Sequence, residues 1–97
     1  MAEVVWTDEA QAWLQEVHDY IAEQDPVAAL RIARGISTRV DQLEQHPESG
    51  YRYEDSSRHI RILVYGNYRI AYLVESPQLV LVLGVFHGAM DIARHLD

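Results

Sequence analysis

Apolar and polar residues follow two different periods along this chain, and each period predicts a different kind of element. Apolar side chains recur three and four positions apart between residues 10 and 21, and again between residues 29 and 43, which predicts two amphipathic helices. The positions best explained as core are Trp6, Trp13, Val17, Ile21, Leu30, Ile36, Val40 and Leu43.

Polar residues and prolines mark the ends of both predicted helices. Thr7, followed by two carboxylates, is a suitable N-cap for a first helix that runs to about Gln24. Asp25-Pro26 ends this helix and begins the next, because Asp caps and Pro is favoured at the first helical position. The second helix breaks at His46-Pro47. The two helices are therefore expected to form an αα-hairpin.

The stretch from Arg58 to Gly88 reads as three consecutive strands with tight turns at Gly66-Asn67 and Ser76-Pro77. A two-residue loop that begins with Gly is typical of a type II′ turn, whose first central residue has a positive φ. The third run, Leu79–Phe86, is apolar without alternation, which predicts an interior strand buried on both faces. Shorter strands are expected at Glu3–Trp6 and, at an edge, at Tyr51–Glu54.

Pairing Tyr65 with Tyr68 across the first turn assigns side chains to the two faces of the sheet. One face carries Ile60, Ile62 and Val64 beside Leu73, Ala71 and Arg69, and the other carries His59, Arg61, Leu63 and Tyr65 beside Val74, Tyr72, Ile70 and Tyr68. Both faces are largely apolar, but only two helices are available to cover them. We therefore expect one face to retain exposed apolar surface, of the kind that marks a partner site.

Helices early and strands late predict an α+β fold. We expect a short N-terminal strand, an αα-hairpin packed on one face of a four- or five-stranded, mainly antiparallel sheet, and a short C-terminal helix. The length of 97 residues suits one domain spanning residues 1–97.

Composition narrows the range of functions. The chain has no cysteine, which excludes disulfides and thiolate chemistry, and its eight basic residues are all arginine. The net charge of −7 argues against a non-specific nucleic-acid binder, which is normally basic over a broad surface. No stretch is apolar enough to predict a membrane span or a leader, so a cytoplasmic location is expected.

Neither a metal nor a cofactor is expected. His87, Asp91 and His95 are spaced by four residues, as metal ligands on one face of a helix would be. Gly88 makes it doubtful that a helix includes His87, so the three side chains are not expected to form a site. No phosphate-binding glycine loop, nucleophile elbow or zinc pattern occurs.

Four segments together resemble the RelE/ParE superfamily of bacterial toxins. They are WTDEAQAWLQEVHDYIAEQDPVAA, LEQHPESG, NYRIAYLV and VLVLGVFHGAMDIARHL. The closing strand with His87, followed by Met90-Asp91 and Arg94–Leu96, is similar to the ParE branch. The resemblance implies a cognate antitoxin whose C-terminal segment wraps the toxin.

The ParE branch implies a non-enzymatic toxin that binds DNA gyrase and traps it on cleaved DNA. No direct sequence-specific contact with nucleic acid and no membrane partner is then expected. Arginine and aromatic anchors are typical of recognition of a protein target. The candidates are Arg58, Arg61, Tyr68, Arg69, Tyr72 and His87.

Two alternatives stay open. A ribosome-dependent mRNA nuclease similar to RelE or YoeB would use Glu54 as base, Arg69 on the phosphate and His87 as acid. That branch normally has lysines and a tyrosine near the C-terminus, and here no lysine occurs and no tyrosine follows Tyr72. The other alternative is a non-toxic family member that only binds antitoxin.

Two of the candidates also have a structural interpretation. Arg69 is as well explained by an ion pair with a helix acid such as Glu16 or Asp19. His87, at the end of a strand, is better explained by a hydrogen bond to a neighbouring backbone carbonyl than by acid catalysis.

Overall fold

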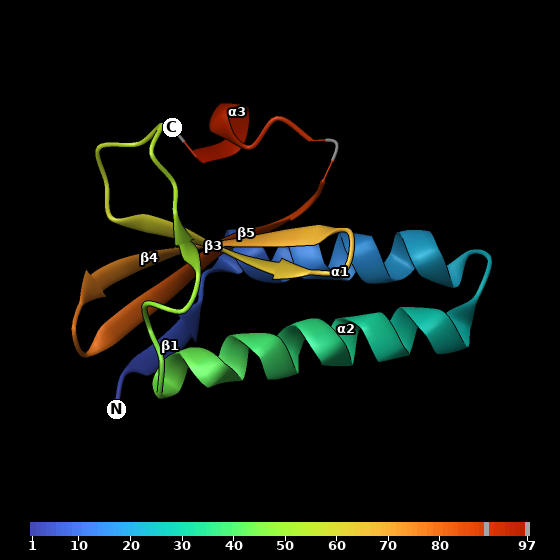
Figure 1. Ribbon diagram of the computed structural model, residues 1–97. Helices are drawn as coiled ribbons and strands as arrows, with labels where there is room; N and C mark the ends of the chain where they lie inside the picture. The colour runs from blue at the N-terminus through green and yellow to red at the C-terminus, as the bar shows by residue number, and fades with distance from the viewer. Residues whose placement is uncertain (89, 97) are drawn as a thin grey trace.

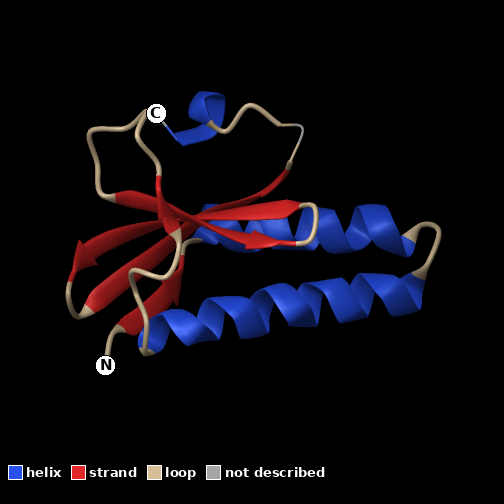
Figure 2. Cartoon of the chain, in the orientation of Figure 1, coloured by secondary structure: helices blue, strands red, loops and turns tan. Residues whose placement is uncertain are grey.

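The computed structural model describes residues 1–88 and 90–96 and shows an α+β fold (Figure 1). The helices are α1 (Asp8–Ala22), α2 (Pro26–Asp41) and α3 (Ala93–Leu96), with one 3₁₀ turn at Gln42–Glu44. The strands are β1 (Glu3–Trp6), β2 (Tyr51–Arg52), β3 (Ile60–Tyr65), β4 (Tyr68–Ser76) and β5 (Leu79–His87), in the sheet order β1-β5-β4-β3-β2. Figure 2 shows α1 and α2 side by side against the sheet, with α3 on its other side.

The helix ends expected from sequence are confirmed within a few residues. Thr7 Oγ1 accepts a hydrogen bond from the Ala10 N–H at 3.1 Å and donates one to the Val82 carbonyl at 2.7 Å, so this cap also fixes α1 to β5. Asp25 Oδ1 accepts from the Ala28 N–H at 3.0 Å at the start of α2. The two caps therefore satisfy N–H groups that helix termini leave without partners.

The register of the β3–β4 hairpin is the one the turn predicts. Tyr65 pairs with Tyr68, and the ladder continues to Ile60 opposite Leu73. Gly66 has a φ of +57° and Asn67 a negative φ, as a type II′ turn requires. The second turn lies one residue later than expected, at Pro77-Gln78, because Ser76 still pairs with Leu79.

Strand β5 is interior, as its unbroken apolar run predicts. It pairs antiparallel with β4 along its length and parallel with β1 from Glu3 opposite Leu79 to Trp6 opposite Val82. The expected edge strand at Tyr51–Glu54 is confirmed but contains only Tyr51 and Arg52.

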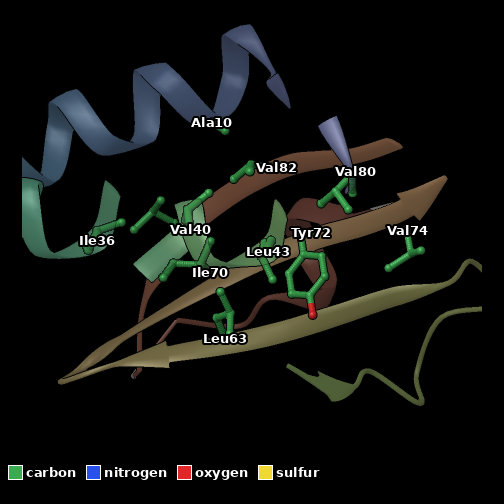
Figure 3. Close-up of a cluster of buried hydrophobic side chains, with 12 residues drawn as sticks. Ala10, Ile36, Val40, Leu43, Leu63, Ile70, Tyr72, Val74, Val80 and Val82 are labelled. Atoms are coloured by element: carbon green, nitrogen blue, oxygen red, sulfur yellow. The ribbon is translucent and has the colours of Figure 1, made fainter. Parts of the chain in front are cut away.

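One hydrophobic cluster lies between the helix pair and the sheet (Figure 3). Ile36 and Val40 of α2 pack there against Leu63, Ile70 and other strand residues, all almost fully buried. Leu30, expected in the core, is instead 45% exposed. It directly follows the buried Ala29, and a step of one residue turns its side chain about 100° away from the buried stripe of the helix.

A second cluster covers the opposite face of the sheet, and this corrects the expectation of an exposed apolar face. Its strand members are Ile60, Ile62, Ala71, Leu73 and Phe86, none more than 8% exposed. After β5 the chain turns back across this face and packs Ile92 and Leu96 on it (Figure 1). We call residues 90–96 the C-terminal cover; of the strand residues expected on this face, Val64 alone is strongly exposed.

The ring of Tyr72 lies in the first cluster (Figure 3). Its Oη accepts a hydrogen bond from the Gly50 N–H at 2.9 Å. Its side chain is fully buried. Burial raises the pKa of Tyr72 above the usual value of about 10, although the Gly50 hydrogen bond and nearby Arg61 oppose this shift. As pH rises past 10, the unfolded chain loses this proton before the folded one does, so stability falls.

Replacing Tyr72 by Phe is expected to cost about 1–2 kcal/mol at pH 7, because the buried Gly50 N–H loses its acceptor. Above pH 10, ionisation of Tyr72 contributes to the fall in stability of the parent chain. The variant should lack this contribution and lose less stability as pH rises. Urea unfolding followed by circular dichroism at pH 7 and above pH 10 measures both effects. A variant whose stability declines as steeply as that of the parent at high pH would contradict this assignment.

Candidate functional site

Arg69 of β4 holds the chain reversal that follows β5. Its Nη2 donates hydrogen bonds to the carbonyls of Gly88 at 3.1 Å and Met90 at 3.0 Å. Arg69 pairs with Phe86 across the ladder and therefore lies on the covered face, away from the helix pair. The structure thus contradicts an ion pair with Glu16 or Asp19, and it gives Arg69 a role in positioning the C-terminal cover.

Arg58 and Arg61 also donate to backbone carbonyls. Arg58 Nη1 lies 3.4 Å from the Leu96 carbonyl, at the far end of the C-terminal cover. Arg61 Nη1 donates to the carbonyls of Gly50 at 2.6 Å and Glu48 at 3.2 Å, and its Nη2 lies 3.5 Å from the Glu48 carboxylate. The three arginines expected to face a target therefore each make contacts within the fold.

Tyr72, another expected target-binding residue, is fully buried, so its side chain does not face a partner. Tyr68 and His87, by contrast, stand at the end of the sheet. They pair across β4 and β5, and their rings meet edge to face with centroids 5.7 Å apart. His87 is exposed and is the last residue of β5, outside any helix, as the sequence indicated.

His87 separates two grooves. One, of about 540 Å³, runs over the β3–β4 turn and is lined by Val64, Asn67, Arg69 and His87 among others. The other, of about 460 Å³, lies between α1 and the end of the sheet. We call the second the aromatic groove and define it by Trp13, Glu16, Tyr20, Tyr68, His87 and Met90.

Trp13, Tyr20 and Met90 of the aromatic groove were not found by sequence reasoning. Trp13 was assigned to the core, and it does pack against both clusters while its remaining surface lines the groove. Tyr20 is 77% exposed. The available signal was the spacing of seven between Trp13 and Tyr20, which places two aromatic rings on one side of α1.

The three residues of the nuclease alternative are not brought together. Arg69 and His87 line one groove, but Glu54 lies beyond β2, next to Tyr53, whose N–H bonds to the Ile60 carbonyl. Arg69 pairs with Val64 on β3. Val64 and Ile60 are four residues apart along that strand, which is about 13 Å. Glu54 therefore lies toward the other end of the sheet from Arg69 and His87.

His87 and His95, two of the three residues considered as metal ligands, contact different aromatic rings. His87 meets Tyr68, whereas His95 stacks on Phe86 with ring centroids 5.4 Å apart. Across residues 1–88 and 90–96 no three His, Asp or Glu side chains are grouped to hold a metal ion. In the same part of the chain, no helix is long and apolar enough to cross a membrane.

Comparison with known proteins gives consistent matches. Residues 4–92 match the model of a family described as the ParE toxin of the type II toxin-antitoxin system parDE. The chain is 37% identical over 89 residues to a protein named Toxin RelE2 of Caulobacter vibrioides, covering 92% of this chain and 98% of that relative. It is 35% identical over 83 residues to Putative toxin Y4kP of Sinorhizobium fredii, covering 86% and 84%.

A solved structure shares the fold. The chromosomal ParDE toxin-antitoxin system from P. aeruginosa contains a chain that superposes with a TM-score of 0.77. The match covers 90% of this chain and 96% of that chain, at 21% sequence identity. The arrangement of helices and sheet is therefore that of a chain in a known toxin-antitoxin system.

Proposed function

Because the chain belongs to the ParE toxin family of type II toxin-antitoxin systems, we propose that it inhibits DNA gyrase by binding it. Family membership implies an antitoxin partner, which on this proposal holds the toxin inactive. The proposed action is cytoplasmic and breaks no bond. Residues 1–97 would act as one domain.

This proposal is carried by one observation, which is that three of the candidate arginines are already bonded within the fold. Arg58, Arg61 and Arg69 donate to backbone carbonyls of the fold. A nuclease that works without a metal needs cationic donors aimed at the scissile phosphate, and the chain has no lysine to add to them. Binding of a protein needs no such free cations.

The aromatic groove is the surface we propose for the target. Tyr20 and Tyr68 offer aromatic contact area, Met90 is adaptable, and His87 and Glu16 add polar groups at the margin. Aromatic side chains around a concavity are typical of the residues that dominate protein interfaces. An antitoxin segment lying across this groove would exclude gyrase, which accounts for neutralisation by competition.

We expect the purified chain, at micromolar concentration, to inhibit DNA supercoiling by gyrase and to increase the amount of cleaved DNA. Tyr20→Ala should weaken this inhibition at least about 10-fold. Hot-spot aromatic side chains commonly contribute about 2 kcal/mol or more, and a tenfold loss needs only about 1.4 kcal/mol. Tyr20 is 77% exposed, so its removal should leave the thermal midpoint unchanged. The measurement is a gel assay of supercoiling and cleavage complexes.

The matched control is Tyr51→Ala, which removes a tyrosine that is 51% exposed on β2, away from the groove. It should inhibit gyrase as strongly as the parent chain. Absence of any gyrase inhibition by the parent would refute the proposed target. Equal loss in both tyrosine variants would refute the groove as the binding surface.

A ribosome-dependent mRNA nuclease is the second candidate, favoured by one feature. Arg69 and His87 share the groove over the β3–β4 turn, and Arg69 Nε is buried there with no hydrogen-bond partner among the described residues. This candidate predicts codon-linked cuts in mRNA on translating ribosomes that disappear in His87→Ala. Intact transcripts would exclude it, and harmless expression without any partner would favour a non-toxic antitoxin-binding protein.

A further inference from the structure

The two long helices carry opposite charges. Helix α1 has Asp8, Glu9, Glu16 and Asp19 and no arginine. Helix α2 has Arg31, Arg34 and Arg39, and its single acid is the last residue. An acidic helix and a basic helix therefore lie side by side on one face of the sheet (Figure 2).

These opposite charges do not neutralise each other within the chain. The side-chain ion pairs among the described residues join Asp19 to His18 and Glu48 to Arg61, and neither pair connects α1 with α2. Glu16, Arg31 and Arg34 are all exposed. Apolar residues of both helices, such as Val17 and Val40, pack in the first cluster, and these charged residues lie on the solvent side.

Exposed apolar side chains accompany the basic stripe. Val27 is 76% exposed and Leu30 is 45% exposed, and both lie in the first turns of α2 next to the arginines. Exposed apolar side chains beside charged residues are typical of an interface. The turn end of the hairpin projects past the strands and is accessible to another molecule (Figure 1).

We propose that this outer face of the α1–α2 hairpin binds a second copy of the same chain. One surface carries an acidic helix beside a basic helix that also has exposed apolar side chains, so its charges are complementary to those of a second copy. A two-fold axis parallel to the helices places α1 of one copy over α2 of the other. A two-fold axis across the helices would instead place acid against acid.

The positions along the helices match this arrangement. Counting outward from Gln24 at the turn, Glu16 is as far along α1 as Ile32 is along α2. A two-fold axis parallel to the helices does not change a residue's distance from the turn along the helix direction. Glu16 and Asp19 of one copy therefore lie opposite the part of α2 that carries Arg31 and Arg34 in the other. Opposite charges at matched positions favour this pairing and its register.

The test uses two charge-reversed chains, Glu16→Arg with Asp19→Arg and Arg31→Glu with Arg34→Glu. Sedimentation velocity from about 1 to 200 μM in low salt should show the parent chain doubling its mass as concentration rises. Each reversed chain alone places like charges against each other and should weaken dimerisation at least about 10-fold. The equimolar mixture should recover the dimer, because every contact again joins opposite charges.

Recovery of the dimer in the mixture is expected only if α1 of one copy contacts α2 of the other. Circular dichroism establishes that both variants are folded, and Arg94→Glu, an exposed change on α3, is the control that should dimerise like the parent chain. A parent chain that stays monomeric throughout overturns the proposal. So does a parent dimer that the reversed chains retain, or a mixture that stays monomeric. Glu16 also lines the aromatic groove, so gyrase inhibition is compared only between the parent chain and the Arg31→Glu with Arg34→Glu chain, whose changes lie outside that groove. Failure of the dimer is then distinguishable from failure of the gyrase proposal.

Discussion

Replacing Ile92 and Leu96 together by alanine is expected to lower the free energy of unfolding by about 4–6 kcal/mol, because both side chains are buried in the second hydrophobic cluster. Small domains have about 5–15 kcal/mol in total, so the variant should be close to unfolding at room temperature. Urea denaturation measures the loss. Increased fluorescence of a hydrophobic dye would report the newly exposed strand residues.

The control for this prediction is Arg94→Ala, which alters an exposed side chain of the same short helix. It should change stability by no more than about 0.5 kcal/mol. A loss below about 1 kcal/mol in the double variant would mean that the C-terminal cover does not pack on the sheet as described. The carbonyl contacts of Arg58 and Arg69 would then also be in doubt.

Phe86→Ala is expected to lower the free energy of unfolding by about 3–5 kcal/mol. The ring is 1% exposed and meets Trp13 edge to face with ring centroids 5.1 Å apart, while His95 stacks on it. It lies over Gly84, where a Cβ would overlap the ring. The alanine variant would have a cavity that borders α1, β5 and the C-terminal cover. Urea unfolding would measure the resulting loss in the free energy of unfolding.

Phe86→Leu provides the matched comparison, because it keeps an apolar side chain of moderate size in the same space. Its cost should be smaller than that of the alanine variant, because it leaves a smaller cavity. A leucine variant as unstable as the alanine variant would show that the aromatic contacts with Trp13 and His95 dominate over cavity volume. A small loss in both variants would contradict the packing of Phe86 altogether.

The helix pair and the β3–β4 hairpin followed directly from the sequence. Thr7 and Asp25 cap the helices within hydrogen-bond distance of their own first turns. Gly66 fixes the turn, and the turn fixes the pairing of Tyr65 with Tyr68 and every pair beyond it. These features depend on residues close together in the chain, where steric and hydrogen-bonding rules leave few alternatives.

The candidate site was only partly accessible to sequence reasoning. His87 and Tyr68, two of the candidates named from sequence, line the aromatic groove, but Tyr72 on the same strand as Tyr68 is buried. Trp13 and Tyr20 come from a helix whose distance from the end of β5 cannot be read from either segment alone. The groove exists because α1 packs on β5, a contact between segments far apart in the sequence.

The sequence by itself determined the elements, the hairpin register and which side chains share each face of the sheet. Only the tertiary structure decided that the second apolar face is covered by Ile92 and Leu96, and that Arg58 and Arg69 hold this cover through backbone carbonyls. Two apolar residues four positions apart do not indicate which surface they cover, and every peptide group offers the same carbonyl acceptor. Which carbonyl an arginine meets is therefore decided by how distant segments pack.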